Sequence, residues 1–315
     1  MIVRWSLTEL TPTLAEVGIE RPFVIASERW RKLDVPHVAW STEVPSTDPT
    51  VPQDADGIVA IGGGSAIDTG KYASAESGKP VVHVPTTYSG AEWTTFYGIR
   101  SPDRVMRGGG GGAHPVAIVY DTELTLDLPR DTTAGTALNA LAHCAEALYA
   151  RGRNDEGDEQ AVEGARLIAS ALPRVLAEPS DREAREELLR GAMHAGRALG
   201  LAGLALAHAM AQALGGTYGI PHGAMNALCL PPALAFNREL VPDEVERFGQ
   251  AIGGDAAEES RRLAVMGGFE NLRRFGVPEA DLPALAASAA QRGGNLANPR
   301  PASPEEILAM FRSIY

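Results

Sequence analysis

Three histidines and two side-chain amides recur at spacings that would group them on helices. Asn139 and His143 are four residues apart, as are His208 and Gln212, and His222 follows in a Pro-His-Gly turn. Residues four apart lie on one side of a helix. Imidazole titrates near neutral pH and can give or take a proton. The pattern therefore predicts a polar site for proton chemistry, built from three segments.

A hydrogen-bonded structural role is the ordinary interpretation of a lone histidine. That interpretation is weaker for His208, because this residue lies in Gly200–Leu214, the most apolar stretch of the chain, where an imidazole needs a buried partner or a ligand. We expect this stretch to form one core helix, shorter than the roughly 20 residues that cross a bilayer. The structural interpretation is kept for the other histidines: His37, His83, His114 and His194.

Glycine and hydroxyl residues follow two predicted strands. Gly62-Gly63-Gly64-Ser65 lies between the strand GIVAI and a helical segment, where backbone amides could hold a pyrophosphate. An ordinary tight turn is the alternative, because the run is neither G-x-G-x-x-G nor a Walker loop. Thr86-Thr87-Tyr88 ends the next strand, and a capping cluster is its alternative. Two polar strand ends in one sheet favour a ligand site.

Four apolar runs of strand length alternate with helical segments in the first part of the chain. They begin at Pro22, Gly57, Pro80 and Val116. Such runs are typical of parallel strands buried on both faces, so we predict a Rossmann-like, doubly wound sheet. Between the last two, Arg100–His114 contains five consecutive glycines, Gly108–Gly112, and we expect a mobile loop because glycine weakens any regular element.

Helical periodicity replaces the strands after Leu128-Pro129. We predict an α/β dinucleotide-binding domain over residues 1–127 and an all-α domain over residues 128–315 that carries the three histidines. The polar groups of both would meet in the cleft between the domains. We expect helix breaks at prolines of the second domain: Pro173, Pro179, Pro221, Pro231, Pro232 and Pro278.

The composition excludes some partners. Lys and Arg number 28 against 40 Asp and Glu, and the formal charge of −12 would repel nucleic acid. Cys144 and Cys229 lie in apolar surroundings without C-x-x-C spacing, so we expect buried thiols in a reducing compartment. Because no secretory signal is visible, we predict a cytoplasmic protein with no membrane partner.

Six motifs in order resemble the iron-containing alcohol dehydrogenases, and within that family the maleylacetate reductase branch. They are GGGSAIDTGK, PTTYSGAE, IVYDTELTLDLP, ALNALAHCAEALY, HAMAQALGGTYGIPHG and NPRP. The resemblance implies the two-domain architecture shared with dehydroquinate synthases, a homodimer, and NADH or NADPH as cofactor. By it, Gly62 to Ser65 would hold the pyrophosphate, Thr86, Thr87 and Tyr88 would lie along the cofactor, and Tyr88 would also belong to the catalytic set.

The resemblance also implies a metal position that this chain changes. Metal-dependent members hold a divalent ion, Fe or Zn, with an Asp and three histidines. His143, His208 and His222 match the histidines, whereas Asn139 replaces the acid and Gln212 replaces a proton-relaying histidine. Neutral ligands leave the charge of the ion uncompensated, so we expect a weak or absent metal. The maleylacetate reductase branch has a similar Asn-Ala-x-Ala-His sequence.

The predicted reaction is reduction of a small, anionic unsaturated keto acid or carbonyl compound by NADH or NADPH. His143, His208 or His222 would stabilise the enolate or supply the proton. One alternative is a decayed or repurposed binding or scaffold protein, favoured by Gln212 and by a region before Gly57 that is short for the family. The other is a dehydroquinate synthase-like lyase or cyclase, which Asn139 and the few lysines disfavour. Ser27 and Glu28 are candidates to contact the adenine ribose, which leaves NADH and NADPH both open.

Overall fold

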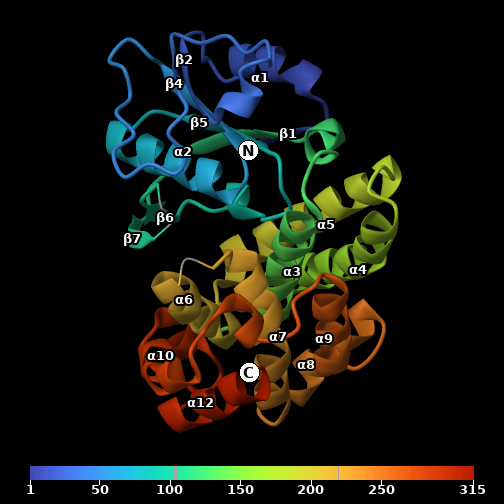
Figure 1. Cartoon of the computed structure of the whole chain (residues 1–315). Helices are drawn as coiled ribbons and strands as arrows, with labels where there is room; N and C mark the ends of the chain where they lie inside the picture. The colour runs from blue at the N-terminus through green and yellow to red at the C-terminus, as the bar shows by residue number, and fades with distance from the viewer. Residues whose placement is uncertain (103–104, 219) are drawn as a thin grey trace. The chain divides into compact units, whose positions relative to one another are not determined.

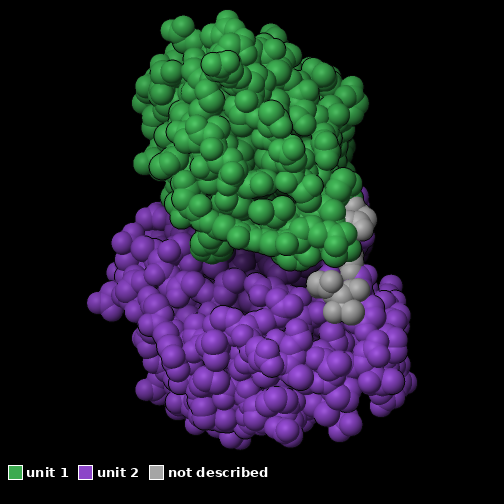
Figure 2. All heavy atoms as spheres, turned by 90° about the vertical axis from the view of Figure 1, so that its left-hand side faces the viewer, with its two compact units in different colours: residues 1–127 green, residues 128–315 purple. Residues whose placement is uncertain are grey.

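The computed structural model describes residues 1–102, 105–218 and 220–315. The chain divides into two compact units, Met1–Asp127 (unit 1) and Leu128–Tyr315 (unit 2), which Figure 2 colours separately. Their helices and strands carry the labels of Figure 1.

Unit 1 is built on a six-stranded parallel sheet. Its order is β1-β8-β5-β4-β2-β3. Figure 1 labels four of these strands, β1, β5, β4 and β2. The predicted parallel α/β fold is confirmed, and the four predicted strands are β2, β4, β5 and β8. The short edge strands β1 and β3 were not predicted. The bounds are β1 (Ile2–Arg4), β2 (Pro22–Ala26), β3 (Ala39–Ser41), β4 (Gly57–Gly62), β5 (Val81–Pro85) and β8 (Pro115–Val119).

The two faces of this sheet carry separate apolar cores, because successive side chains of a strand point to opposite faces. Val24 and Val59 lie on the face that packs against helix α1 (Leu10–Glu16). Phe23 and Ile58 lie on the opposite face, against helix α2 (Gly64–Ser77). Residues 42–56, between β3 and β4, contain no helix or strand. Part of this connection still packs on the α2 side of the sheet, through Val44, Val51 and Ala55.

The prediction of a mobile loop at Arg100–His114 was wrong for part of that segment. Strands β6 (Tyr97–Arg100) and β7 (Met106–Gly110) form an antiparallel pair that includes three of the five glycines. A Cβ on Gly109 would lie 2.9 Å from the carbonyl oxygen of Tyr97, and one on Gly110 would lie 2.7 Å from the Tyr97 hydroxyl. Close approach of two strands thus needs glycine here. Residues 103 and 104 of the predicted loop lie outside the described residues.

Unit 2 is helical throughout its described residues, which confirms the predicted all-α half. Helix α3 is central, with 14 of its 18 residues buried, so each of its polar side chains needs a partner. The helices are α3 (Arg130–Ala147), α4 (Asp155–Ala177), α5 (Arg182–Ala202), α6 (Leu206–Tyr218), α7 (His222–Arg238), α8 (Pro242–Ile252), α9 (Ala256–Met266), α10 (Leu282–Ala290), α11 (Gly293–Ala297) and α12 (Pro304–Ser313).

Two expectations for unit 2 were wrong. Pro173 lies inside α4, and Pro231 and Pro232 lie inside α7. Each proline removes one helical hydrogen bond, and the packing of α4 on α5 and of α7 on α3 and α6 outweighs that loss. Gly200–Leu214 is not one helix either, because α5 ends at Ala202 and α6 begins at Leu206. Gly203 follows α5 with φ of 83°, a conformation that favours glycine.

No single helix in the described ranges is both long and apolar enough to cross a membrane. Helix α5 and the first part of α6 reach that length and composition only as a pair, bent by 102°.

Candidate active site

The structure brings the three singled-out histidines of unit 2 together. His143 on α3 and His208 on α6 stack with their ring centroids 4.8 Å apart and their planes at 18°. His222, the first residue of α7, lies 5.8 Å from His208 between ring centroids. His143 and His208 are buried, and His222 is half-buried. Three helices thus supply one imidazole cluster.

Two amides connect this cluster. Nδ2 of Asn139 lies 3.4 Å from Nε2 of His143. Asn226 donates from Nδ2 to Oδ1 of Asn139 at 2.6 Å, and the same nitrogen lies 3.0 Å from Nε2 of His222. An amide nitrogen only donates, so Nε2 of His143 and Nε2 of His222 are acceptors. The ring proton of each of these two histidines therefore lies on Nδ1. Asn226 was missed, although it follows His222 by four residues, the spacing that identified Asn139 and His143.

A buried carboxylate holds His208. Oε2 of Glu146 lies 2.6 Å from Nδ1 of His208 and accepts the backbone N–H of Ala205 at 2.8 Å, while Oε1 accepts the backbone N–H of His208 at 3.1 Å. Glu146 therefore ties α3 to the start of α6, where it accepts backbone N–H groups, and fixes a proton on Nδ1 of His208. Sequence analysis missed it, although it is a lone carboxylate in the apolar segment ALNALAHCAEALY.

Two imidazole nitrogens of the cluster are buried and have no hydrogen-bond partner among the described residues: Nδ1 of His143 and Nε2 of His208. Burial, together with the neighbouring rings of His208 and His222, holds the pKa of His143 well below its usual range. His143 is therefore neutral near pH 7, with Nδ1 as its donor. Unpaired buried polar atoms of this kind are available to a ligand. Gln212 is half-buried, one turn beyond His208 on α6.

The donor set of the cluster does not fit a tightly held divalent metal. Oδ1 of Asn139 accepts from Asn226, and Nε2 of His222 faces the same amide. The Glu146 carboxylate is used by α6 and by Nδ1 of His208. Within the ranges that the structure describes, no three His, Cys, Asp or Glu side chains are grouped so that they could bind an ion. A neutral set of this kind leaves a dication uncompensated.

The second candidate group, in unit 1, forms a backbone cradle at the carboxyl end of β4. Gly62 has φ of 150°, and a Cβ on Gly63 would lie 2.8 Å from Cγ2 of Thr87. Gly64 and Ser65 begin α2, and its N-cap residue, Gly63, has no side chain to cap the first turn. The amide groups and the positive end of this 14-residue helix suit a pyrophosphate, so the cradle fits a dinucleotide.

The segment after β5 packs against this cradle. Thr86 donates its backbone N–H to the carbonyl of Gly62 at 3.0 Å. Thr86, Thr87 and Tyr88 are all buried, and Oγ1 of Thr87 has no hydrogen-bond partner among the described residues. The two polar segments predicted from the sequence, residues 62–65 after β4 and residues 86–88 after β5, therefore pack together, and the Thr87 hydroxyl is available to a ligand.

A buried network supports the same segment. Tyr120 donates its hydroxyl proton to Glu92 at 2.7 Å and accepts from the Trp93 indole at 2.8 Å. Nδ1 of His83 lies 3.1 Å from the backbone carbonyl oxygen of Glu92. Burial raises the pKa of Glu92 to about 7 and lowers the pKa of His83 to about 3. Through Glu92, this network joins His83 of β5 to Tyr120, the residue after β8.

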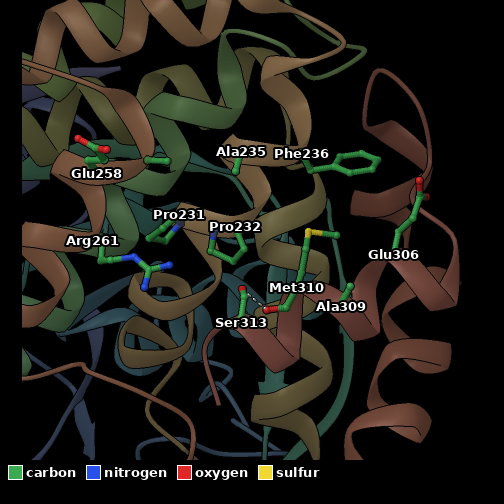
Figure 3. Close-up of a pocket in the computed structure, with 11 residues that line it drawn as sticks. Pro231, Pro232, Ala235, Phe236, Glu258, Arg261, Glu306, Ala309, Met310 and Ser313 are labelled. Carbon is green, nitrogen blue, oxygen red and sulfur yellow. Dashed lines mark hydrogen bonds between the residues drawn. The ribbon is translucent and has the colours of Figure 1, made fainter.

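A cavity of about 550 Å³ lies elsewhere in unit 2. It is lined by α7, α9 and α12, and Figure 3 shows Pro231, Phe236 and Met310 around it. Its part of α7 is more than one turn beyond Asn226, and its lining includes none of the histidines. The cavity and the imidazole cluster are separate features.

Comparison with known proteins identifies relatives over nearly the whole chain. The family described as "Iron-containing alcohol dehydrogenase" matches residues 10–129, and "Fe-containing alcohol dehydrogenase family, C-terminal" matches residues 133–315. The maleylacetate reductase of Sphingobium indicum is 38% identical over 260 residues, 82% of this chain and 73% of that protein. That of Burkholderia cepacia is 37% identical over 263 residues, 83% and 74% of the two chains.

Solved structures are similar over the full chain. The crystal structure of maleylacetate reductase from Rhizobium sp. strain MTP-10005 has a TM-score of 0.88 at 30% identity and covers 100% of this chain and 95% of that one. Maleylacetate reductase from Agrobacterium tumefaciens has a TM-score of 0.89 at 29% identity with the same coverage.

Proposed function

Because the chain belongs to the iron-containing alcohol dehydrogenase family and is an NAD(P)-dependent oxidoreductase, we propose that it reduces a small, anionic unsaturated keto acid of the 2-maleylacetate type. One observation carries the proposal: Nδ1 of His143 and Nε2 of His208 are buried without partners in a cluster whose facing groups are neutral. An anionic substrate meets no unpaired carboxylate there. The relatives named maleylacetate reductase support the substrate class.

The residues of the cluster have different roles in the proposed reaction. NADH or NADPH, when held by residues 62–65 and 86–88, would supply a hydride for the carbon β to the carbonyl, and the electron pair of the C=C bond would then move toward the carbonyl oxygen. Nδ1–H of neutral His143 donates a hydrogen bond to that enolate oxygen. Nε2 of His208 takes one proton from solvent water, and the ring, oriented and charge-compensated by Glu146 at Nδ1, passes that proton to the α carbon. One hydride and one proton thus give the saturated keto acid and the oxidised cofactor.

We assign the remaining predicted residues on the same basis. Gly62-Gly63-Gly64-Ser65 binds the pyrophosphate through backbone amides, and Thr86-Thr87-Tyr88 contacts the cofactor beside it. Asn139 fixes the His143 tautomer. Gln212 has no acidic proton, so it contributes hydrogen bonds to substrate and not a proton.

The test is turnover by protein dialysed against EDTA, with 2-maleylacetate and either NADH or NADPH. We expect loss of the reduced nicotinamide absorbance without added metal, and His208→Ala should lower kcat by about 10²- to 10⁴-fold. His194→Ala is the matched control, because His194 is a half-buried histidine of α5 that contacts Gln160. Cofactor binding without oxidation would refute the substrate class. Absence of cofactor binding would favour a scaffold protein.

Two further proposals concern the setting of the enzyme. Cys144 and Cys229 are free and buried, which suits the reducing cytoplasm. The family resemblance supports a homodimer. Light scattering behind size-exclusion chromatography tests the assembly, and a monomer mass would refute it.

A further inference from the structure

The residues after β2 border the same crevice as the glycine cradle. β2 and β4 are hydrogen-bonded neighbours, with Ala26 beside Ile61. From β2 the chain continues to β3 at one edge, and from β4 it continues to β5 on the other side. The connections after these two strands therefore leave in opposite directions. Such a reversal opens a crevice at the carboxyl ends of the strands, where nucleotides bind.

This strand end is rich in positive charge. In dinucleotide sites an acidic side chain holds the 2′-hydroxyl of NADH, whereas an arginine accommodates the 2′-phosphate of NADPH. Here Ser27 follows β2 directly; it is half-buried and its hydroxyl does not cap the following 3₁₀ turn. Arg29, Arg31 and Lys32 come next, all exposed. The one carboxylate, Glu28, is 78% exposed and lies 3.8 Å from Arg31.

Two tryptophans hold the arginines. The guanidinium carbon of Arg29 lies 4.4 Å from the ring centroid of Trp30, and that of Arg31 lies 4.9 Å from the ring centroid of Trp40. Trp40 in turn donates its indole N–H to the carbonyl of Ala26, the last residue of β2, at 2.9 Å. Arg31 is thereby tied to the carboxyl end of β2. A guanidinium stacked on a ring keeps its N–H edge available for phosphate.

We propose that this chain prefers NADPH to NADH, because Arg29 and Arg31 bind the 2′-phosphate and Ser27 donates its hydroxyl to it. The inference rests on the proposed cofactor site and deepens it by naming the residues that select the nucleotide. NADH offers these cations no 2′-phosphate, and the carboxylate nearest this strand end, Glu28, lies beside Arg31.

Fluorescence titration with NADPH and NADH, and competition by 2′,5′-ADP against 5′-AMP, test the preference without any substrate. We expect NADPH to bind at least about tenfold more tightly, and Arg31→Ala or Arg29→Ala to weaken NADPH about tenfold while NADH changes less than about threefold. Glu28→Gln should tighten NADPH. Arg21→Ala is the control, because Arg21 precedes the opposite end of β2, where it pairs with Asp54.

Ser27→Asp should reverse the cofactor preference, since a carboxylate at position 27 should favour NADH and weaken the binding of 2′,5′-ADP. Retained NADH binding shows that each variant is folded. Equal affinity for the two nucleotides, unaffected by Arg31→Ala, would overturn this inference and leave the proposed function standing. Failure to bind either nucleotide would overturn both.

Discussion

Glu146→Gln tests whether the buried carboxylate positions His208. The carboxylate accepts three N–H donors, two on Oε2 and one on Oε1. Glutamine keeps one oxygen and replaces the other with an NH₂ group that can only donate. If NH₂ replaces Oε1, it opposes the backbone N–H of His208. If it replaces Oε2, it opposes Ala205 and forces His208 to move its proton to Nε2. Each arrangement leaves a buried donor unpaired.

The cost follows from the burial of this group. A hydrogen bond to a charged group contributes about 1.5–3 kcal/mol, and an unpaired buried donor costs about 1–3 kcal/mol, so we expect a loss near 2 kcal/mol. For a unit of this size that is a fall of roughly 4–8 °C in Tm. Because glutamine carries no charge that could stabilise the protonated His208 ring from Nδ1, kcat should fall about 100-fold, while KM changes less than about threefold.

Thermal unfolding, steady-state kinetics and nitrogen NMR of the His208 ring measure the three effects. The ring signal distinguishes a positioning role from a structural one, because only the former moves the proton between nitrogens. Glu163→Gln is the control, since Glu163 pairs with Arg166 on the solvent-accessible side of α4 and its loss should cost less than about 0.5 kcal/mol. A Glu146→Gln enzyme with unchanged Tm, kcat within twofold and the same tautomer would refute the reasoning.

Three other perturbations test the remaining parts of the molecule. Gly63→Ala places a Cβ 2.8 Å from the Thr87 methyl group and should weaken cofactor binding at least about tenfold in fluorescence titrations. Gly111→Ala, with no described atom within 4 Å, should not. Asn139→Asp adds the missing carboxylate and should raise zinc retained after dialysis about tenfold, whereas EDTA should leave wild-type turnover unchanged; equal zinc in both proteins would contradict this. For Glu92, whose pKa rises from 4.5 to about 7 on folding, the folded state binds more protons, so the stability of unit 1 falls as pH rises from about 4.5 to about 7, by at most about 3 kcal/mol. His83, whose pKa is lowered from 6.5 to about 3, has the opposite effect and removes stability as pH drops below about 6.5. In denaturant midpoints measured across pH, Glu92→Gln should therefore abolish the loss of stability above pH 4.5 and keep the loss below pH 6.5 that His83 causes. The same pH dependence in Glu92→Gln and wild type would count against the burial argument.

The parts of the fold that local pattern determines were predictable. β2, β4, β5 and β8 are apolar runs that end in glycine or polar residues, and burial on both faces of a parallel sheet requires that composition. The three-residue strands β1 and β3 are only half-buried, so they leave no run to detect. Their place is decided by pairing with β8 and β2, which a single segment does not reveal.

The mispredicted elements depend on contacts between segments far apart in sequence. Gly109 and Gly110 can pair with β6 because Tyr97 leaves room only for glycine opposite it. The apolar stretch around Gly203 breaks because Glu146, more than fifty residues earlier, accepts the amide groups at the start of α6. The same carboxylate completes the candidate site. Local spacing identified the amide and histidine pair on α3, but the partner of His208 was set by tertiary packing.

The position of one charge decides what the imidazole cluster can do. The family resemblance places a carboxylate at position 139, beside the nitrogens that would face an ion, and this chain has a neutral amide there. The buried carboxylate of this cluster, Glu146, lies instead on the Nδ1 side of His208, where it fixes the ring and leaves Nε2 without a partner among the described residues. Charge beside the open nitrogens would attract a cation. Charge behind the ring orients a proton carrier instead. The cluster is therefore suited to hydrogen bonding and proton transfer to an anionic substrate, and the fate of bound zinc in Asn139→Asp measures how much that single charge decides.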